Sequence, residues 1–404
     1  MAVYTMQLTQ DNGVLTITLD DRIDTSNANG IRDEIFSTLE SQQPSAVVLD
    51  AGSLNYISSA GIRVVIGLLK RLNGKVSLID ASPDVYNVFE MTGVSQMMEV
   101  HKRLREVSLD NATFLNKGGN GEIWRLDPET VIKVYNPGAA LDKIRRENDV
   151  ARVAFTSGLP CAIPFDTVRV GDRYGIVFEL LDAETVGHTV SKNPERVGEF
   201  GRVMGELMRE MHHTKVDSPD MPRMTEKANA WIDYLAENYL EADDAALMRS
   251  VVEAIPETET LLHLDFHEGN VMIQDDELVL IDLDDMCIGN PLYDLVAHWV
   301  GHVMSPQTTP EATEKSFGMS AELTTQLFYP TMQAYFGTDD AQVIERHNQT
   351  MQLFSLFFVM LYLAKGKDSS NLTPERIQGV LQQILPQFRQ FAPQIIQVAG
   401  SYRF

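Results

Sequence analysis

The stretch HLDFHEGN at residues 263–270, followed by LVLIDLDD at residues 278–285, decides how the rest of the chain is interpreted. Two short apolar runs, VMI after the first stretch and LVLI within the second, are bounded by polar residues and are typical of buried strands. We therefore expect a loop, a strand, a turn at QDDE and a second strand. Such a hairpin would bring Asn270 close to Asp282, with Asp265 on the adjoining loop.

An acid, an amide and a second acid in this order suit one kind of chemistry. Phosphoryl transfer from magnesium-bound ATP needs a carboxylate that orients and deprotonates the acceptor hydroxyl. It also needs an amide and a carboxylate whose oxygens hold the metal. The alternative is that these are ordinary loop and turn residues, because Asp and Asn are common at strand ends. Features upstream in the chain favour the first interpretation.

The pattern His263-x-Asp265-x-x-x-x-Asn270, with Asp282 on the next strand, resembles the aminoglycoside phosphotransferase and choline kinase family, which is related in fold to protein kinases. The resemblance implies ATP and Mg²⁺ as ligands. It implies catalytic-loop roles for Asp265, which would act on the acceptor, and for His263, which would brace the loop rather than transfer a proton. It also implies a metal site built from Asn270, Asp282 and Asp284.

Two positions depart from the family pattern. Leu264 stands where the family commonly has Gly, and we expect it only to tighten the loop. Asp284 stands where protein kinases carry the Gly of Asp-Phe-Gly. Because choline-kinase-like members often have an acid near this point, Asp284 is expected to add to the metal site.

A glycine-rich turn at 118–121 lies between two predicted strands. Glycines let backbone N–H groups approach phosphates closely, although a plain Gly hairpin is the other interpretation. The next predicted strand, 131–135, carries Lys133, and a helix expected over 140–156 carries Glu147. A strand lysine is ordinarily a solvated charge, but in kinases such a lysine contacts the α- and β-phosphates and pairs with a helix Glu. The resemblance therefore implies catalytic or nucleotide-binding roles for Lys133, Glu147, Gly119 and Gly121.

Two further strands, expected at 167–170 and 174–181, form a hairpin that leads into a second lobe. In kinases the segment after such a strand is the hinge, whose main chain binds adenine. By position, the resemblance assigns this role to Glu179 and Leu181. The rest of the chain is predicted to be helical, with a breaker at Pro386.

Three polar features stand out in the helical region. Asp294, in the stretch GNPLYD, matches an acid that braces the catalytic loop in the resembled family. His298 and His302 are one helical turn apart and could ligate a metal, but a pair without a third ligand is more often a core or surface pair. His212 and His213 are adjacent and cannot both ligate from one helical face.

Strands alternate with helices before residue 108, which predicts an α/β layer on a mixed sheet. The first two strands would pair across the hairpin signal Asn12-Gly13. The expected strands are 4–8, 14–19, 46–49 and 76–79. The expected helices have N-caps at 24–26, at Ser58 or Ser59, and just before Pro83.

Segments 21–24, 54–62 and 82–93 of this region resemble a STAS domain, the fold of bacterial anti-sigma factor antagonists. In that family a partner kinase phosphorylates a serine at the start of a helix, and the matching position is Ser59. A phosphate there would sit at the positive end of the helix dipole. The family often has Asp before this serine, whereas this chain has Ser58. The alternative is that Ser59 is a plain helix N-cap.

At 404 residues the chain is too long for one ordinary core. We expect a STAS-like domain at 1–108 and a kinase-like domain at 109–404, which combines α/β and α+β classes. The second domain would have a small β-rich lobe at about 109–182 and a large helical lobe at about 183–404.

Composition restricts the partners. A net charge of −24 and no evident basic face argue against nucleic acid as a partner. Neither a signal peptide nor a membrane-spanning segment is evident, so no membrane role is expected and the cytoplasm is the default location. The two cysteines, Cys161 and Cys287, are expected to be small buried residues rather than a disulfide or metal site.

The sequence therefore predicts an ATP-dependent phosphotransferase acting on a hydroxyl of an unidentified small molecule or protein, with a STAS domain for a regulatory protein partner. The alternative is a nucleotide-binding regulatory protein that switches partners through phosphorylation at Ser59. A third hypothesis is that the kinase domain phosphorylates its own Ser59, because covalent linkage raises the effective concentration.

Overall fold

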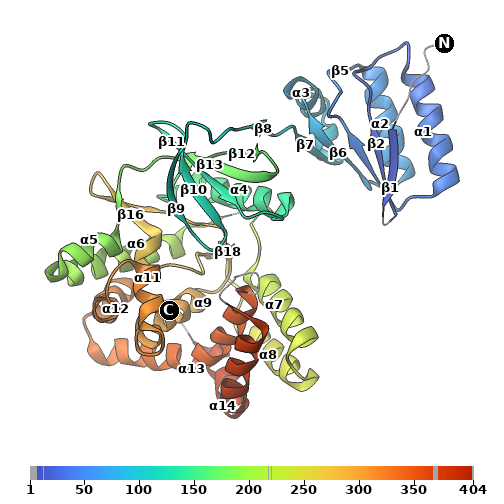
Figure 1. The fold of residues 1–404 in the computed structure, drawn as a ribbon. Coiled ribbons are helices and arrows are strands. Elements are labelled where there is room, and N and C mark those ends of the chain that lie inside the picture. Colours follow the sequence, from blue (N-terminus) through green and yellow to red (C-terminus); the bar gives the residue numbers. More distant parts are fainter. Residues whose placement is uncertain (1–6, 12, 217, 220, 367–371, 403–404) are drawn as a thin grey trace. The chain divides into compact units, whose positions relative to one another are not determined.

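The computed structural model describes residues 7–11, 13–216, 218–219, 221–366 and 372–402. The chain divides into two compact units, Met1–Glu106 and Val107–Phe404 (Figure 1). Each unit has its own hydrophobic core. Of the predicted N-terminal hairpin, residues 4–6 and Asn12 lie outside the described residues.

The first unit is built on a five-stranded mixed sheet with the order β1-β2-β4-β6-β7, which confirms the predicted α/β layer. β1 runs antiparallel to β2, and the other neighbours run parallel. Alternate residues are buried, such as Leu15 and Ile17 of β2, as the period-2 pattern requires. The strands up to the unit boundary are β1 (Gln7–Asp11), β2 (Val14–Thr18), β3 (Arg22–Ile23), β4 (Ala46–Asp50), β5 (Tyr56–Ile57), β6 (Val76–Ala81), β7 (Glu99–Lys102) and β8 (Arg105–Glu106).

Two of the three helix starts in this unit are as predicted. Ser58 caps α2 by accepting a hydrogen bond from the backbone N–H of Ala60 at 3.2 Å, and Ser82 caps α3. The predicted cap of α1 at 24–26 is wrong, because the helix begins only after Asn27, whose Oδ1 accepts the backbone N–H of Asp24 at 2.7 Å. The helices are α1 (Ala28–Gln42), α2 (Ser59–Arg71), α3 (Pro83–Met91) and the 3-10 turn η1 (Val94–Gln96).

The second unit begins with a β-rich small lobe, in whose sheet the strands of this unit follow the order β12-β13-β11-β10-β9. The pairs from β9 to β13 are antiparallel. The buried side chains of Ile132, Val134 and Val168 form the centre of its core. Its elements are β9 (Thr113–Lys117), β10 (Gly121–Arg125), β11 (Thr130–Tyr135), α4 (Leu141–Thr156), β12 (Pro164–Val170) and β13 (Arg173–Glu179).

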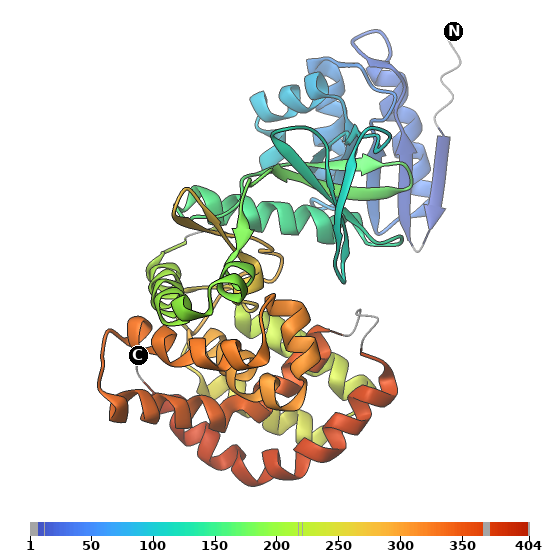
Figure 2. The ribbon, with the colours of Figure 1, turned by 60° about the vertical axis from the view of Figure 1, so that its left-hand side comes forward.

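The large lobe follows and is mainly helical; in Figures 1 and 2 its helices run from green to red. Among its described residues it contains two small sheets, the three-stranded β14-β16-β17, which includes the predicted hairpin of β16 and β17, and the two-stranded β15-β18. The β elements and short turns are β14 (Glu184–Thr185), η2 (Pro194–Arg196), β15 (Leu261–Leu262), η3 (Glu268–Asn270), β16 (Val271–Gln274), β17 (Glu277–Leu280) and β18 (Cys287–Ile288). The helices are α5 (Val186–Lys192), α6 (Val197–His213), α7 (Met224–Asn238), α8 (Ala242–Ala254), α9 (Leu292–Trp299), the π-helical turn η4 (Val300–Met304), α10 (Ser305–Thr308), α11 (Pro310–Phe317), α12 (Ala321–Phe336), α13 (Ala341–Lys365) and α14 (Pro374–Ser401).

Helix packing explains two features of this lobe. A Cβ on Gly205 of α6 would lie 2.2 Å from the carbonyl oxygen of Thr331, so glycine lets α6 and α12 pack backbone to backbone. The predicted break at Pro386 is wrong, because α14 continues through it. The buried face of that helix extends to both sides of the proline, at Leu381 and Phe388, and this packing offsets the lost backbone hydrogen bond.

Both cysteines are buried and free, as predicted. Among the described residues, the structure contains no helix of the length and apolar character needed to cross a membrane.

Candidate active site

The β16–β17 hairpin positions two of the predicted metal ligands. Its turn consists of Asp275 and Asp276, whose φ angles of 50° and 66° suit a two-residue hairpin turn. At the open end, the backbone N–H of Ile281 donates to the carbonyl oxygen of Asn270 at 3.0 Å. Asn270 and Asp282 therefore start from adjacent positions at one end of the hairpin, as the sequence predicted.

Asp265, the predicted catalytic aspartate, is held by the same asparagine. Asn270 Nδ2 donates to the carbonyl oxygen of Asp265 at 3.0 Å and to its Oδ2 at 3.2 Å. His267 Nε2 lies 3.8 Å from Oδ2. The Asp265 side chain is 37% exposed, so an acceptor can reach it. Because the Asn270 amide nitrogen is used in this way, its oxygen is the atom left for a metal.

Asp294 braces the start of the loop, as the resemblance implied. Its carboxylate accepts the backbone N–H groups of His263 at 2.8 Å and Leu264 at 2.7 Å. His212 Nε2 lies 3.1 Å from the same carboxylate, and its Nδ1 lies 2.8 Å from the hydroxyl of Tyr335. Burial would raise the pKa of Asp294, but these hydrogen bonds lower it below its ordinary value.

Two residues of the loop are explained by their conformation. Leu264 has a φ of 61°, in the left-handed region that glycine adopts most easily, and this accounts for the Gly that the resembled family has there. Its side chain is buried, which offsets the conformational cost. The ring of His263 is also buried, edge-on to Phe266, and neither ring nitrogen has a hydrogen-bond partner among the described residues. This placement favours bracing over proton transfer for His263.

Lys133 of the small lobe contacts Glu147 of the same lobe and two carboxylates of the large lobe, Asp282 and Asp284. Its Nζ lies 2.6 Å from Asp282 Oδ1, 2.9 Å from Glu147 Oε1 and 3.7 Å from Asp284 Oδ2. The hydroxyl of Tyr135 donates a further hydrogen bond to Glu147. Burial favours the neutral amine, but the three carboxylates outweigh it and hold the pKa of Lys133 well above its ordinary value.

Negative charge exceeds positive charge in this cluster. Carboxylate oxygens of Glu147, Asp282 and Asp284 lie within 4.8 Å of one another around the single ammonium of Lys133. Burial and the neighbouring carboxylates raise the pKa of Asp284 to about 8 despite the lysine. Burial would also raise the pKa of Asp282, but Lys133 lowers it. Oxygen donors with an excess of negative charge fit a hard divalent cation such as Mg²⁺.

The glycine-rich turn lies next to the same carboxylates. The backbone N–H of Gly118 donates to the carbonyl of Gly121 at 2.9 Å, and Asn120 Nδ2 donates to Asp284 Oδ2 at 3.1 Å. A Cβ on Gly121 would lie 2.2 Å from the carbonyl oxygen of Val134, so only glycine fits there. No heavy atom of the described residues lies within 4 Å of a Cβ built on Gly119, so that position is open.

The predicted hinge segment makes its hydrogen bonds within the small lobe. The side chain of Glu179 accepts the backbone N–H of Ile163 at 2.8 Å, and its own backbone N–H donates to the Ile163 carbonyl at 3.1 Å. The backbone N–H of Leu180 donates to the Glu129 carbonyl at 2.7 Å. The N–H groups of Glu179 and Leu180 are therefore engaged within the small lobe, and Leu181 follows them.

Sequence reasoning missed four polar residues around the site: Asn120, Lys227, Asp285 and Lys365. Asp285 directly follows a predicted ligand, and that adjacency was its one available signal. Asn120 lies within the predicted glycine-rich turn at 118–121, but its side chain was given no role there. Lys227 and Lys365 come from distant segments and carry no motif. The His298–His302 pair has its rings 3.7 Å apart, and His302 Nε2 lies 2.9 Å from Glu268 Oε1. It is a buried core pair, as the sequence analysis favoured.

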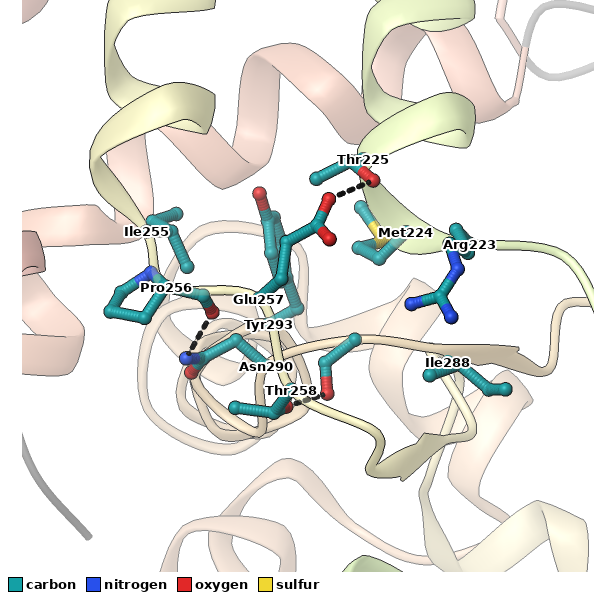
Figure 3. Close-up of a pocket in the computed structure, with 11 residues that line it drawn as sticks. Arg223, Met224, Thr225, Ile255, Pro256, Glu257, Thr258, Ile288, Asn290 and Tyr293 are labelled. Atoms are coloured by element: carbon teal, nitrogen blue, oxygen red, sulfur yellow. Dashed lines mark hydrogen bonds between the residues drawn. The ribbon is translucent and has the colours of Figure 1, made fainter. Parts of the chain in front are cut away.

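A small cavity behind β18 is unrelated to this chemistry (Figure 3). Its lining is tied by hydrogen bonds from Thr225 to Glu257 at 3.0 Å and from Asn290 to the Pro256 carbonyl at 2.8 Å. The hydroxyl of Tyr293 has no partner among the described residues. The cavity volume is about 10 Å³, which is room for about one water molecule and none for a nucleotide.

A small β-rich lobe whose lysine meets loop carboxylates of a helical lobe defines a kinase-like phosphotransferase. Residues 103–327 match the model of the phosphotransferase enzyme family, and the chain belongs to that family. Residues 5–107 match the STAS domain model. Both resemblances read from the sequence are confirmed.

The similar proteins include one relative in sequence and two solved structures. A candidate anti-sigma factor antagonist, BtrV of Bordetella bronchiseptica, is 36% identical over 100 residues, which are 24% of this chain and 85% of that protein. The ADP-bound crystal structure of aminoglycoside phosphotransferase APH(2'')-Ib is 13% identical with a TM-score of 0.45, covering 78% of this chain and 98% of that one. A choline/ethanolamine kinase family protein from Mesorhizobium loti is 14% identical with a TM-score of 0.45, covering 72% and 92%.

Proposed function

We propose that the second unit transfers the γ-phosphoryl group of ATP to the hydroxyl of a small molecule. The proposal rests on the ion pair between Lys133 Nζ of the small lobe and Asp282 Oδ1 of the large lobe, which lie 2.6 Å apart. Phosphoryl transfer depends mainly on positioning and charge stabilisation, and this group supplies both.

The proposed reaction runs at Asp265. The acceptor oxygen forms a bond to the γ-phosphorus while the bond from that phosphorus to the β,γ-bridging oxygen breaks, and the hydroxyl proton passes to the Asp265 carboxylate. Asn270 fixes Asp265 through two hydrogen bonds, and Asp294 fixes the loop that carries it. His263 supports the loop from the interior.

Lys133 would bind the α- and β-phosphates, and Glu147 would hold the lysine in place. The turn carrying Gly119 and Gly121 would cover the phosphates with its backbone. Main-chain groups at Glu179 to Leu181 would contact adenine, and the occupied N–H groups there leave carbonyl oxygens and the Leu181 N–H for this role.

Asp282, Asp284 and the amide oxygen of Asn270 would hold Mg²⁺. The excess of carboxylates around Lys133 supports this assignment. When bound, Mg²⁺ would neutralise charge on the phosphates. Glu147 belongs to the same cluster but is already engaged by Lys133 and Tyr135, so we assign it to the lysine.

The test is magnesium-dependent ATP consumption by the purified chain, with and without a panel of hydroxyl compounds. We expect turnover that requires Mg²⁺ and that Lys133→Met abolishes. Absence of both nucleotide binding and turnover at every metal concentration would reject the proposal.

We further propose that the STAS domain binds a regulatory protein and that phosphorylation of Ser59 controls this binding. Ser59 is exposed at the first position of α2, whereas the capping role belongs to Ser58. The similarity of this unit to anti-sigma factor antagonists supports the proposal. A phosphate on Ser59 would sit at the positive end of α2.

Intact-mass measurement after incubation with Mg-ATP tests whether the chain's own kinase unit modifies this serine. One added phosphate that Ser59→Ala removes and Ser58→Ala retains is the expected result. A mass gain that persists in Ser59→Ala would contradict the assignment.

A further inference from the structure

Two lysines of the large lobe, Lys227 and Lys365, contact the same carboxylate, that of Asp285. Lys227 belongs to α7 and Lys365 is the last residue of α13, and these two helices pack against each other. Their side chains are mostly buried, with 19% and 15% exposed. Lys365 Nζ lies 2.7 Å from Asp285 Oδ2 and donates to the Leu264 carbonyl at 3.2 Å. Lys227 donates to the Asp285 carbonyl at 2.8 Å and lies 3.4 Å from its Oδ1.

Not all N–H donors of these two lysines form hydrogen bonds within the described residues. An ammonium has three N–H donors, and within the described residues each lysine makes two hydrogen bonds. One N–H on each lysine is therefore available in a mostly buried position, where an unpaired donor is costly. Oxygen atoms of a ligand would satisfy these donors.

The charge balance here differs from that at Lys133. Around Lys133, three carboxylates surround one ammonium. Around Lys227 and Lys365, two ammonium groups are balanced by the carboxylates of Asp285 and Asp265, although the whole chain carries a net charge of −24. This cluster therefore lacks the excess of negative charge that would repel an anion.

Lys365 also faces the proposed base. Burial would lower the pKa of Lys365, but Asp265 and Asp285 hold it well above its ordinary value, so the lysine stays charged. It follows directly from the contact with the Leu264 carbonyl that the ammonium lies beside the residue preceding Asp265. The half-exposed ring of Tyr362 has its centroid 5.4 Å from Lys365 Nζ.

We propose that Lys227 and Lys365 form an oxyanion subsite for the acceptor, which is therefore a small hydroxyl compound carrying a carboxylate or a phosphate group. This inference rests on the proposed phosphotransferase function. The anionic group would take the two spare N–H donors and present the neighbouring hydroxyl to Asp265. The same charges disfavour a cationic acceptor.

The experiment uses the full chain, saturated with Mg²⁺ and a non-hydrolysable ATP analogue so that the phosphate positions are occupied. Binding of glycerol phosphate, glycerate, glycerol and choline is compared at constant ionic strength. We expect the two anions to bind more tightly than glycerol and choline, and the stronger of the two identifies the preferred oxyanion. Lys365→Met should weaken anion binding about tenfold or more, and Lys365→Arg should largely preserve it. Lys192→Met, which removes an exposed lysine paired with Glu184, is the matched control.

Other outcomes overturn the subsite. Choline that binds as tightly as the anions would overturn it. An equal loss of glycerol and anion binding in Lys365→Met would also overturn it, because Lys365 would then only link the Leu264 segment to Asp285. If Lys365→Met does not fold, the same binding measurements are made on Lys227→Met. If the nucleotide analogue itself does not bind, the proposed function fails; if it binds and no anion preference is seen, only the subsite fails.

Discussion

Lys133 and Asp282 are separated by 149 positions in the chain, yet the ammonium and the carboxylate lie 2.6 Å apart. The lysine comes from a central strand of the small lobe and the aspartate from the end of the β17 strand in the large lobe. Asp282 also has a φ of 59°, a conformation unusual for a residue other than glycine. Strained residues of this kind are concentrated at functional sites, where surrounding structure holds them in place.

The first prediction concerns Asp282→Asn. Because the variant removes the charge that would hold Mg²⁺, we expect ATP turnover to fall about 10²–10³-fold or more, with the fold intact. Turnover and circular dichroism measure the two effects. Asp276→Asn is the control, since Asp276 lies in the turn of the same hairpin and its left-handed backbone also suits Asn. Unchanged turnover in Asp282→Asn would reject the metal-site assignment.

The second prediction separates the two glycines of the phosphate turn. Gly121→Ala would place a Cβ 2.2 Å from a backbone oxygen of β11, so we expect about 2–3 kcal/mol of lost stability. Gly119→Ala meets no neighbouring atom among the described residues and should leave stability unchanged while raising KM for ATP. Thermal unfolding and ATP kinetics of both variants decide this. Equal unfolding temperatures for the two would show that the turn is looser than described.

Local patterns predicted the parts of the site that depend on local structure. The β16–β17 hairpin follows from two apolar runs and a polar turn, and Lys133 and Glu147 follow from one strand and the next helix. The turn that carries Asn120 was predicted, but its contact with Asp284 was not, and Lys227 and Lys365 could not be found in this way. Each reaches the site from a segment more than fifty residues away, and no spacing rule connects it to Asp284 or Asp285.

The errors in the fold have the same origin. The cap of α1 was assigned to 24–26 because Asp, Thr and Ser all favour caps, but Asn27 takes that position and holds the Asp24 backbone. Pro386 was expected to end a helix, but burial of residues on both sides of it carries α14 through. Tertiary packing outweighed a local preference in the second case.

The third prediction is that Asp294→Asn destabilises the protein. The carboxylate accepts two backbone N–H groups and faces His212, and an amide NH₂ cannot accept all three. Loss of one partner from such a buried group costs about 3 kcal/mol, measurable by denaturant unfolding. Since the folded pKa of Asp294 is lowered, its stabilising contribution is present above about pH 4 and is lost as the pH falls through the folded value.

A surface acid provides the comparison. Asp233→Asn removes an exposed partner of Arg249 and should cost less than about 0.5 kcal/mol. Equal costs for the two variants would mean that Asp294 does not brace the catalytic loop.

The fourth prediction concerns acid sensitivity and His298. This buried ring lies against His302 and Phe328, and neither nitrogen has a partner among the described residues. Burial, followed by the nearby His302, holds the pKa of His298 well below its ordinary value. Below about pH 6.5 this histidine therefore binds a proton in the unfolded chain but stays neutral in the folded protein. The free energy of unfolding then falls by up to about 1.4 kcal/mol per pH unit.

Replacing this histidine should remove that slope. We expect His298→Phe to lose less stability than the wild type between pH 6.5 and about pH 5.5, by roughly 1 kcal/mol in denaturant unfolding. The other ionisable groups around this ring are present in both proteins, so the difference between the two curves isolates His298. Phe328→Leu changes the packing of the same ring without removing a titrating group and should lower stability equally at both pH values. A wild-type slope that survives in His298→Phe would place the acid-sensitive group elsewhere.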